Sequence, residues 1–164
     1  YIVAQILGGV AGAALVYAVY RDSIQFFESQ NGIARDGGDG SIGIFVTGPA
    51  GYFGDYWGPF LTEVVGTAFL LLFVFAVVDL MNLPPKANLA PVVIGLAVFA
   101  IGNSFGANSG YAINPARDLG PRLAHALLPI AGKGGSDWGY AWIPIVGPLV
   151  GALVGAFTYR LLFA

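Results

Sequence analysis

Long apolar stretches alternate with polar segments along the chain, and they predict helices that cross a membrane. Three of these stretches cover residues 1–20, 60–80 and 141–163. Each reaches the length of about 20 residues that a helix needs to cross about 30 Å of hydrocarbon. A fourth stretch, residues 89–101, is apolar but shorter and runs into a polar, glycine-rich segment that begins at Gly102. We predict a helix over residues 89–104 that crosses the membrane and then breaks.

A short helix is predicted where the chain resumes after this polar segment. Asn114 is a favoured N-cap residue, and Pro115 suits the first helical position because its missing N–H would have no partner there. At about 1.5 Å per residue, the apolar part of a helix over residues 114–128 covers about half the membrane. Irregular backbone at membrane depth requires protein or water partners. Residues 102–113 should therefore be buried or line a passage.

The remaining pattern completes the predicted fold. Residues 21–58 are rich in Gly, Asp and Ser and predict an exposed extramembrane loop or lid. Glycines recur at four-residue spacing in the first and last apolar stretches (Gly8 and Gly12; Gly147, Gly151 and Gly155), which allows close helix packing. We predict one all-α integral membrane domain over residues 1–164, with four spanning helices and one re-entrant half-helix.

Composition supports a lipid-facing exterior and excludes several functions. The chain is 57% hydrophobic and 10% charged, against about 45–50% and about 25% in soluble domains. Its net charge of −2 and the lack of a basic run give no sign of a nucleic-acid partner. There is no cysteine and only one histidine, His125, to which we assign no partner or role. With no nucleophile beside a base and no metal-ligand cluster, we expect neither catalysis nor a cofactor.

Three charged residues stand out against this background. Arg117 places a cation beside the positive end of the predicted half-helix, which costs at least about 2.5 kcal/mol at membrane depth. A guanidinium facing a pore could donate to hydroxyls and repel cations; a snorkelling or loop-paired arginine is the alternative. Asp118 suits a helix start, with Arg122 four residues on as its partner. Glu63 could either serve the site or accept backbone N–H groups from the irregular segment.

Residues 110–118, Gly-Tyr-Ala-Ile-Asn-Pro-Ala-Arg-Asp, resemble the second Asn-Pro-Ala signature of the aquaporins. The Arg-Asp that follows the signature resembles the aquaglyceroporin, or glycerol facilitator, type. The predicted helices are similar to the family's third to sixth, so the resemblance implies the carboxyl-terminal part of an aquaporin-like bundle. The first two helices, the first signature and the fourth filter residue would then be missing, and we expect a fragment of a longer protein.

The resemblance also implies roles for individual residues. Its selectivity filter corresponds to Gly102, Tyr111 and Arg117, and its signature to Asn114, Pro115 and Ala116. Water-selective members carry histidine where this chain has Gly102, so a wider opening suited to a polyol is implied. The pore-lining carbonyls correspond to Asn108, Ser109, Gly110 and Tyr111, and the supporting residues to Glu63, Asp118 and Pro144.

The resemblance finally implies a function for the complete form. That form would be a passive channel for glycerol, water and other small neutral solutes, a homotetramer in a lipid membrane, either the plasma or the inner cell membrane. A non-conducting truncated membrane subunit and a water-selective aquaporin are the alternatives.

Overall fold

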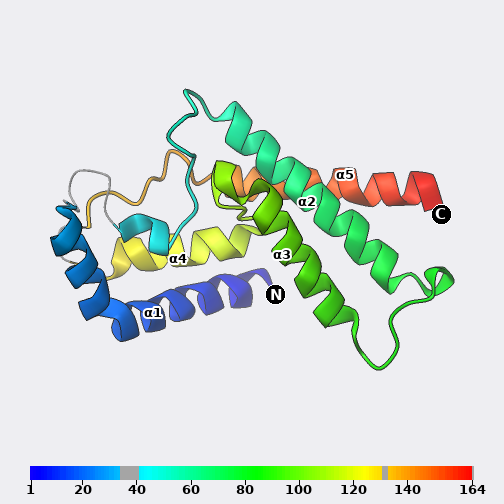
Figure 1. Cartoon of the computed structure of the whole chain (residues 1–164), viewed down its shortest axis with the longest axis horizontal. Helices are drawn as coiled ribbons and strands as arrows, with labels where there is room; N and C mark the ends of the chain where they lie inside the picture. Colours follow the sequence, from blue (N-terminus) through cyan, green and yellow to red (C-terminus); the bar gives the residue numbers. More distant parts are fainter. Residues whose placement is uncertain (34–40, 131–132, 164) are drawn as a thin grey trace.

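The computed structural model describes residues 1–33, 41–130 and 133–163, and all regular elements in these ranges are helices. Its α-helices are α1 (Ile2–Asn31), α2 (Trp57–Val78), α3 (Ala90–Ser109), α4 (Pro115–Leu127) and α5 (Ile143–Phe163), joined by short 3-10 helices η2 (Ser41–Ile44) and η3 (Leu80–Asn82) (Figure 1). Four of them, α1, α2, α3 and α5, are long and apolar enough to span a membrane. The shorter α4 is not, so the predicted all-α fold with four spans and a half-helix is confirmed.

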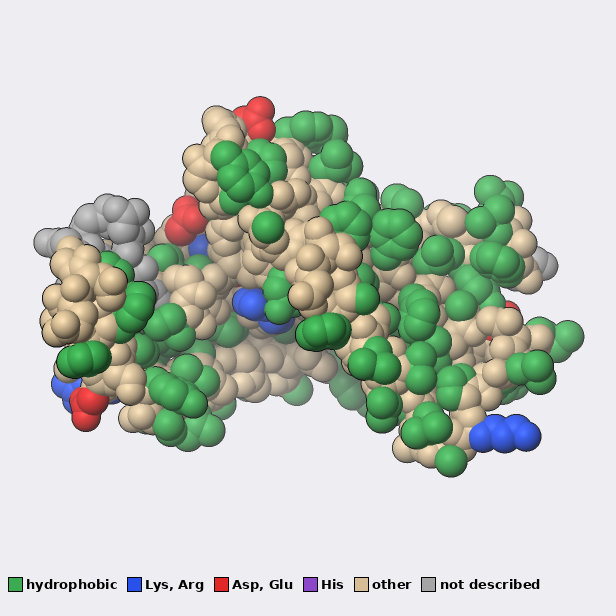
Figure 2. Space-filling model, in the orientation of Figure 1, with side chains coloured by type: hydrophobic (Ala, Val, Ile, Leu, Met, Phe, Trp, Pro, Cys, Tyr) green, Lys and Arg blue, Asp and Glu red, His purple; other side chains and the backbone are tan. Residues whose placement is uncertain are grey.

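Two helix packings organise the molecule. α2 packs against α5 and α3, and α4 packs against α1 and, over a smaller area, α5 (Figure 1). Hydrophobic side chains cover most of the α2 and α3 surface, with acidic and basic groups mainly at the ends of the elements (Figure 2). An apolar exterior of this kind is suited to lipid rather than water.

Glycines allow the helix backbones to come close together at both packings. A Cβ added to Gly151 or Gly155 would lie 2.3 Å from the carbonyl oxygen of Val64 or Ala68, so the predicted close packing of the last helix is confirmed. In α1 the prediction was wrong about the residues. Gly8 and Gly12 have no atom of the described residues within 4 Å of an added Cβ, whereas Gly9 would meet the Ala116 carbonyl oxygen of α4 at 3.0 Å.

The first helix is longer than predicted. α1 continues through the first part of the expected 21–58 loop and ends at Asn31, where Gly32 adopts a left-handed conformation with φ 62°. Residues 21–31 are polar but contain no glycine or proline to stop a helix, so the helix extends beyond the apolar stretch. Residues 34–40 of the expected loop lie outside the described residues. Phe45, Val46 and Thr47 are buried, so this part is not a simple exposed lid.

The predicted end of the third spanning helix near residue 104 is also wrong. α3 remains helical to Ser109 and ends at Gly110, which is left-handed with φ 80°. The polar side chains within it do not compete with the helix: Asn103 Nδ2 donates to the Phe99 carbonyl at 2.8 Å, and Ser104 Oγ donates to the Ala100 carbonyl at 2.9 Å. Only five residues, 110–114, therefore connect α3 to α4, and the last of them is the N-cap Asn114. We call residues 110–113 the filter loop, after the selectivity filter that the resemblance implies.

Candidate functional site

The amino end of α4 is capped and faces open space. Asn114 has extended backbone, and its Oδ1 accepts the N–H of Ala116 at 2.9 Å, while Pro115 occupies the first turn. The side chains of Asn114 and Arg117 are both exposed. The unpaired N–H groups of a helix start carry a partial positive charge, so this end attracts oxygen atoms of a neutral or anionic solute.

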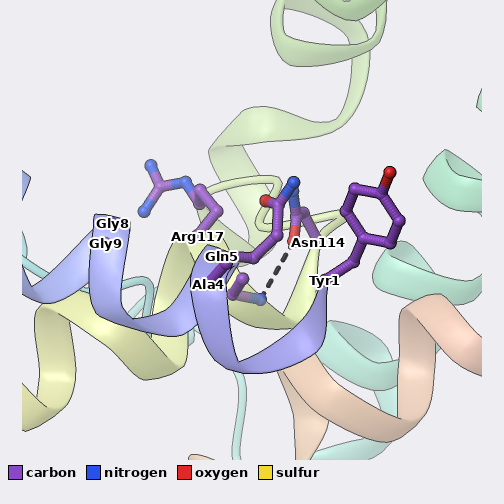
Figure 3. A pocket seen from close by; sticks show the side chains of 8 residues that line it. Tyr1, Ala4, Gln5, Gly8, Gly9, Asn114 and Arg117 are labelled. Carbon is purple, nitrogen blue, oxygen red and sulfur yellow. Dashed lines mark hydrogen bonds between the residues drawn. The ribbon is translucent and has the colours of Figure 1, made fainter.

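Two cavities flank this helix end. The first, about 460 Å³, lies between α1 and α4 (Figure 3), and the second, about 380 Å³, lies between α2, α3, α5 and the same helix end. Asn114 and Arg117 line both cavities. The first also includes Tyr1, Gln5 and Gly8, and the second is mostly apolar, with Leu70, Leu71, Val98, Tyr111, Ile113 and Leu149 among its lining. Polar groups are thus concentrated on one side of an otherwise apolar space.

Arg117 has no hydrogen bond or ion pair with any residue in the described part of the chain. Its guanidinium extends toward Gly8 and Gly9 of α1, away from the Asn114 amide, and the Gln5 side chain is seen between the two (Figure 3). A guanidinium has five N–H donors and no acceptor. With respect to the described residues, all of its donors are therefore free to bind oxygen atoms of a solute, and the loop-paired alternative is not observed there.

The filter loop has an unusual backbone conformation. Gly110, Tyr111 and Ile113 all have positive φ, at 80°, 41° and 41°. For Tyr111 and for β-branched Ile113 this region is costly, and such strain persists only where surrounding contacts hold it. The loop therefore needs partners on both sides.

Glu63 of α2 supplies one set of partners. It is fully buried, and its carboxylate accepts the Ser109 hydroxyl at 2.6 Å and the backbone N–H groups of Ala112 and Ile113 at 2.9 and 2.7 Å. Of the two alternatives for this residue, the backbone contacts are the ones observed. Charge-assisted bonds to backbone N–H groups are among the stronger hydrogen bonds in proteins, so they offset part of the loop's strain.

The Tyr111 ring lies flat on two glycines of α3. A Cβ added to Gly102 would lie 2.9 Å from the ring, and one added to Gly106 would lie 2.7 Å from it. The ring is 38% exposed and lines the second cavity. Gly102, Tyr111 and Arg117 therefore all lie around the filter loop, with the aromatic ring and the guanidinium on the same cavity.

The four expected pore carbonyls do not form one uniform group. Asn108 lies within α3, and its carbonyl oxygen accepts the N–H of Ala50 at 2.9 Å. Among the described residues, the carbonyls of Ser109, Gly110 and Tyr111 are given no hydrogen-bond donor. The Asn108 carbonyl is thus partly occupied, because Ala50 of the α1–α2 connection donates to it.

The opposite face of α4 forms a buried polar network. Arg122 is fully buried and uses all five donors: two bonds to Asp118, two to the carbonyls of Ser136 and Asp137, and one to the Thr47 carbonyl, at 2.7–3.0 Å. The Asp118 carboxylate also accepts the N–H and the hydroxyl of Thr47 at 2.8 and 2.6 Å. The predicted Asp118–Arg122 pair is confirmed. The Thr47 contact was missed, because nothing in the local pattern joins residues 71 positions apart.

Two further residues complete this side of the site. His125 was expected to have no nearby partner, but its Nδ1 lies 2.9 Å from the Ser136 hydroxyl, and its ring packs against Phe45. The connector after α4 folds back over that helix, which sequence spacing does not indicate. Pro144 is fully buried at the start of α5. The described residues contain no group of three or more side chains suited to hold a metal ion.

Comparisons with known proteins agree with this arrangement. The chain is 46% identical over 162 residues to glycerol uptake facilitator protein 3 of Lactiplantibacillus plantarum and 45% identical over 163 residues to a probable glycerol uptake facilitator protein of Thermotoga maritima. Each alignment covers 99% of this chain. The chain spans 62% and 64% of the length of these two relatives.

A solved structure has the same fold. The X-ray structure of the aquaglyceroporin from Plasmodium falciparum superposes with a TM-score of 0.81 at 29% sequence identity, covering 100% of this chain and 63% of that one. Residues 1–159 match the sequence profile described as major intrinsic protein. These members are channels rather than enzymes, in agreement with the expectation from the residues. The chain is a multi-pass membrane protein that belongs to the major intrinsic protein family, among its glycerol facilitators and aquaglyceroporins.

Proposed function

We propose that the complete protein is a passive channel that conducts glycerol, water and other small neutral solutes. The observation that carries this proposal is the amino end of α4, where Asn114 and Arg117 are exposed between two cavities and Arg117 has no partner among the described residues. A charged side chain without a partner is costly within a membrane-spanning domain unless it faces water or a solute.

The charge at this end supports the choice of neutral solutes. Arg117 and the positive end of α4 act in the same direction, so a cation or a proton meets electrostatic repulsion there. The free donors of Arg117 and the Asn114 amide can instead replace water around a hydroxyl group. The site therefore favours a solute that carries oxygen acceptors and no net positive charge.

Tyr111 and Gly102 support glycerol within this class. The Tyr111 ring lies on the glycines of α3, and it presents an apolar face to the same cavity that the guanidinium lines. Glycerol has a carbon edge and a hydroxyl edge, so it can contact the ring and the donors together. The names of the bacterial relatives, glycerol uptake facilitators, support the same solute.

Light scattering from proteoliposomes tests this proposal. Vesicles with the complete protein, in which this chain is joined to the two helices and the half-helix that the resemblance implies, should reswell rapidly in a glycerol gradient. Vesicles with the 164-residue chain alone form the second sample, and a flat trace from them would identify the chain as a non-conducting subunit. A flat trace from both samples would refute the channel.

Substitutions assign the roles within the complete protein. Arg117→Ala should raise the leak of small cations while glycerol still passes, because the repulsive charge is removed. Gly102→His should reduce glycerol passage far more than water passage, because the opening narrows. Equal losses for both solutes would show that Gly102 does not set the width of the opening. An unchanged cation leak in the arginine variant would remove that residue from the proposed filter.

We also propose a homotetramer in the plasma or inner cell membrane, as the resemblance implies. Native mass spectrometry of the detergent-solubilised complete protein should give four copies. A monomer that conducts glycerol at the same rate would contradict the tetramer without affecting the proposed channel.

A further inference from the structure

We propose that one segment of the connection between α1 and α2, residues 45–52, positions both ends of the filter loop and so sets how well the constriction distinguishes glycerol from water. This inference rests on the proposed channel. It assigns a positioning role to Thr47 and Tyr52, two residues that lie outside the filter and outside the Asn-Pro-Ala signature.

The 45–52 segment contacts the end of α3, where the filter loop begins. The N–H of Ala50 donates to the Asn108 carbonyl at 2.9 Å. The Tyr52 hydroxyl lies 2.6 Å from Asn108 Oδ1 and 3.2 Å from the Ala107 carbonyl oxygen. The Asn108 amide is held on its other side by the Thr62 hydroxyl at 3.2 Å. The carboxyl end of α3 is therefore tied to this segment through Asn108.

The same segment contacts the start of α4, where the filter loop ends. The N–H and the hydroxyl of Thr47 both donate to Asp118, in the first turn of α4, and the Thr47 carbonyl accepts from Arg122. The Thr47 side chain also packs against Gly110, where an added Cβ would lie 3.1 Å from its methyl carbon. Thr47 is 4% exposed, so these bonds are shielded from water.

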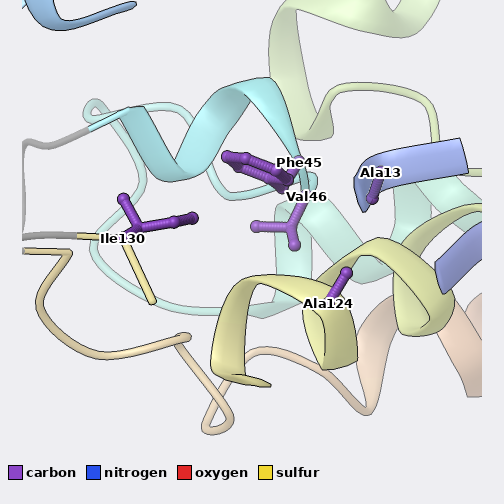
Figure 4. Packing of buried hydrophobic residues seen from close by; sticks show 5 residues of the cluster. All are labelled: Ala13, Phe45, Val46, Ala124 and Ile130. Atoms are coloured by element: carbon purple, nitrogen blue, oxygen red, sulfur yellow. The ribbon is translucent and has the colours of Figure 1, made fainter. Parts of the chain in front are cut away.

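The base of the segment is fixed by apolar packing. Phe45 and Val46 are buried in a cluster with Ala13 of α1, Ala124 of α4 and Ile130 (Figure 4). Two side chains held in a packed core cannot shift without leaving a cavity. The polar contacts of residues 47–52 therefore start from a fixed point rather than from a free loop.

The filter loop has little conformational freedom to adjust when its two ends move. It has only four residues, and three of them are held at positive φ. Glu63 fixes the loop's middle from the opposite side, through the N–H groups of Ala112 and Ile113. A shift of the α3 end relative to the α4 end must then be taken up at Tyr111, whose ring lies on Gly102 and Gly106. Ring position and filter width follow from the contacts of the 45–52 segment.

Tyr52 and Tyr56 give a matched pair of substitutions for the test. Tyr52 is 67% exposed, so Tyr52→Phe removes its hydroxyl contacts without disturbing a core. Tyr56 lies in the same connection and is also exposed, but its hydroxyl makes no hydrogen bond among the described residues. Tyr56→Phe is therefore the control. Thr47→Val removes the hydroxyl and keeps the shape, whereas Thr47→Ser keeps the hydroxyl and should restore the native behaviour.

The first readout does not depend on conduction. Hydrogen–deuterium exchange of the lipid-reconstituted chain reports how firmly the filter loop is held. In peptides covering residues 108–118, exchange should be about two- to tenfold faster in Tyr52→Phe and Thr47→Val, the factor for losing one hydrogen bond. Tyr56→Phe and Thr47→Ser should match the native chain. Unchanged exchange in Tyr52→Phe and Thr47→Val would overturn the positioning role, whatever the protein conducts.

The second readout is the ratio of glycerol to water permeability in proteoliposomes with the complete protein. Tyr52→Phe and Thr47→Val should change this ratio severalfold, while Tyr56→Phe and Thr47→Ser leave it unchanged. A faster-exchanging filter loop with an unchanged ratio would refute the effect on selectivity. If the native complete protein gave a flat trace, the proposed channel would fail, while the exchange result would still decide the structural role.

Discussion

The two arginines of α4 lie five positions apart and have opposite surroundings. Arg122 is fully buried, with all five N–H donors bonded to Asp118 and to three backbone carbonyls. Arg117 is exposed beside two cavities and has no partner among the described residues. One face of a short helix is thus used to hold the helix in place, and its amino end keeps free donors, as the proposed channel requires. Burial and hydrogen bonding, rather than residue type, separate structure from function here.

The largest effect should come from removing the buried arginine. Arg122→Met leaves the Asp118 carboxylate buried without its charge partner, which costs about 3–5 kcal/mol. Arg117→Met should change stability by less than about 0.5 kcal/mol, as expected for an exposed side chain. Unfolding of the detergent-solubilised chain in SDS, followed by circular dichroism, measures both. Similar losses of stability in the two variants would show that burial does not distinguish the two arginines.

A smaller loss is expected at Glu63, which holds the filter loop from α2. Glu63→Gln keeps one oxygen acceptor but places an amide NH₂ where a backbone N–H now donates. The unsatisfied donors should cost about 1–3 kcal/mol. The same SDS titration measures this change. A stability equal to that of the native chain would show that the Glu63 bonds do not offset the backbone strain of the loop.

A substitution at Gly102 tests whether the site around the exposed Arg117 tolerates an added side chain. Gly102→Ala places a methyl carbon 2.9 Å from the Tyr111 ring, so the ring must move into the adjacent cavity. Gly95→Ala, in the same helix with no atom within 4 Å of its added Cβ, is the control. We expect the Gly102 variant to be about 1 kcal/mol less stable than the control and to lose glycerol permeability severalfold in the complete protein. Equal stability and equal glycerol permeability of the two variants would show that the Tyr111 ring does not lie against Gly102.

The smallest effect on stability is expected for the hydrogen-bonded pair of Tyr159 and Asp79, at the carboxyl end of α2. The Tyr159 hydroxyl and the Met81 N–H donate to Asp79, and these bonds lower the pKa of its carboxyl below the ordinary value of 3.8. Such a carboxylate stabilises the fold above its unfolded pKa, and the contribution is lost as the pH falls through its folded pKa. Tyr159→Phe should lower the Tm slightly at pH 7 and not at pH 2. A pH-independent difference would assign the effect to packing.

Most of α4 could be predicted from the sequence, but little of what surrounds this helix could be. The Asn114 cap, Pro115 and the Asp118–Arg122 pair are local patterns, and all three are found as predicted. The end of α3 was misplaced because Gly102 and Ser104 are helix-breaking by propensity, while tertiary packing of the Tyr111 ring makes glycine favourable there. Propensity is a weak guide where a neighbouring ring requires a residue without a side chain.

Contacts between distant segments could not be predicted in the same way. Thr47 meets Asp118 across 71 positions, and Ser136 covers His125 because the connector after α4 folds back. No periodicity marks such a pair. Gly9 was passed over for Gly8 and Gly12 because spacing alone does not show which side of α1 faces α4. Residues that are adjacent in sequence point in directions about 100° apart around a helix, so Gly8 and Gly9 lie on different faces of α1.

The contact between α5 and α2 has a consequence for how the protein is made. Gly151 and Gly155 lie against the carbonyls of Val64 and Ala68, while α3 and α4 come between these helices in the chain. During synthesis, this contact cannot form until the ribosome has delivered α5 to the bilayer. The carbonyls of Ser136 and Asp137 that complete the shell of Arg122 also emerge after α4. The Asp118 partner of Arg122 is already present in the same helix, but two of the five hydrogen bonds of Arg122, and the α2–α5 contact, require parts of the chain that are made after α4.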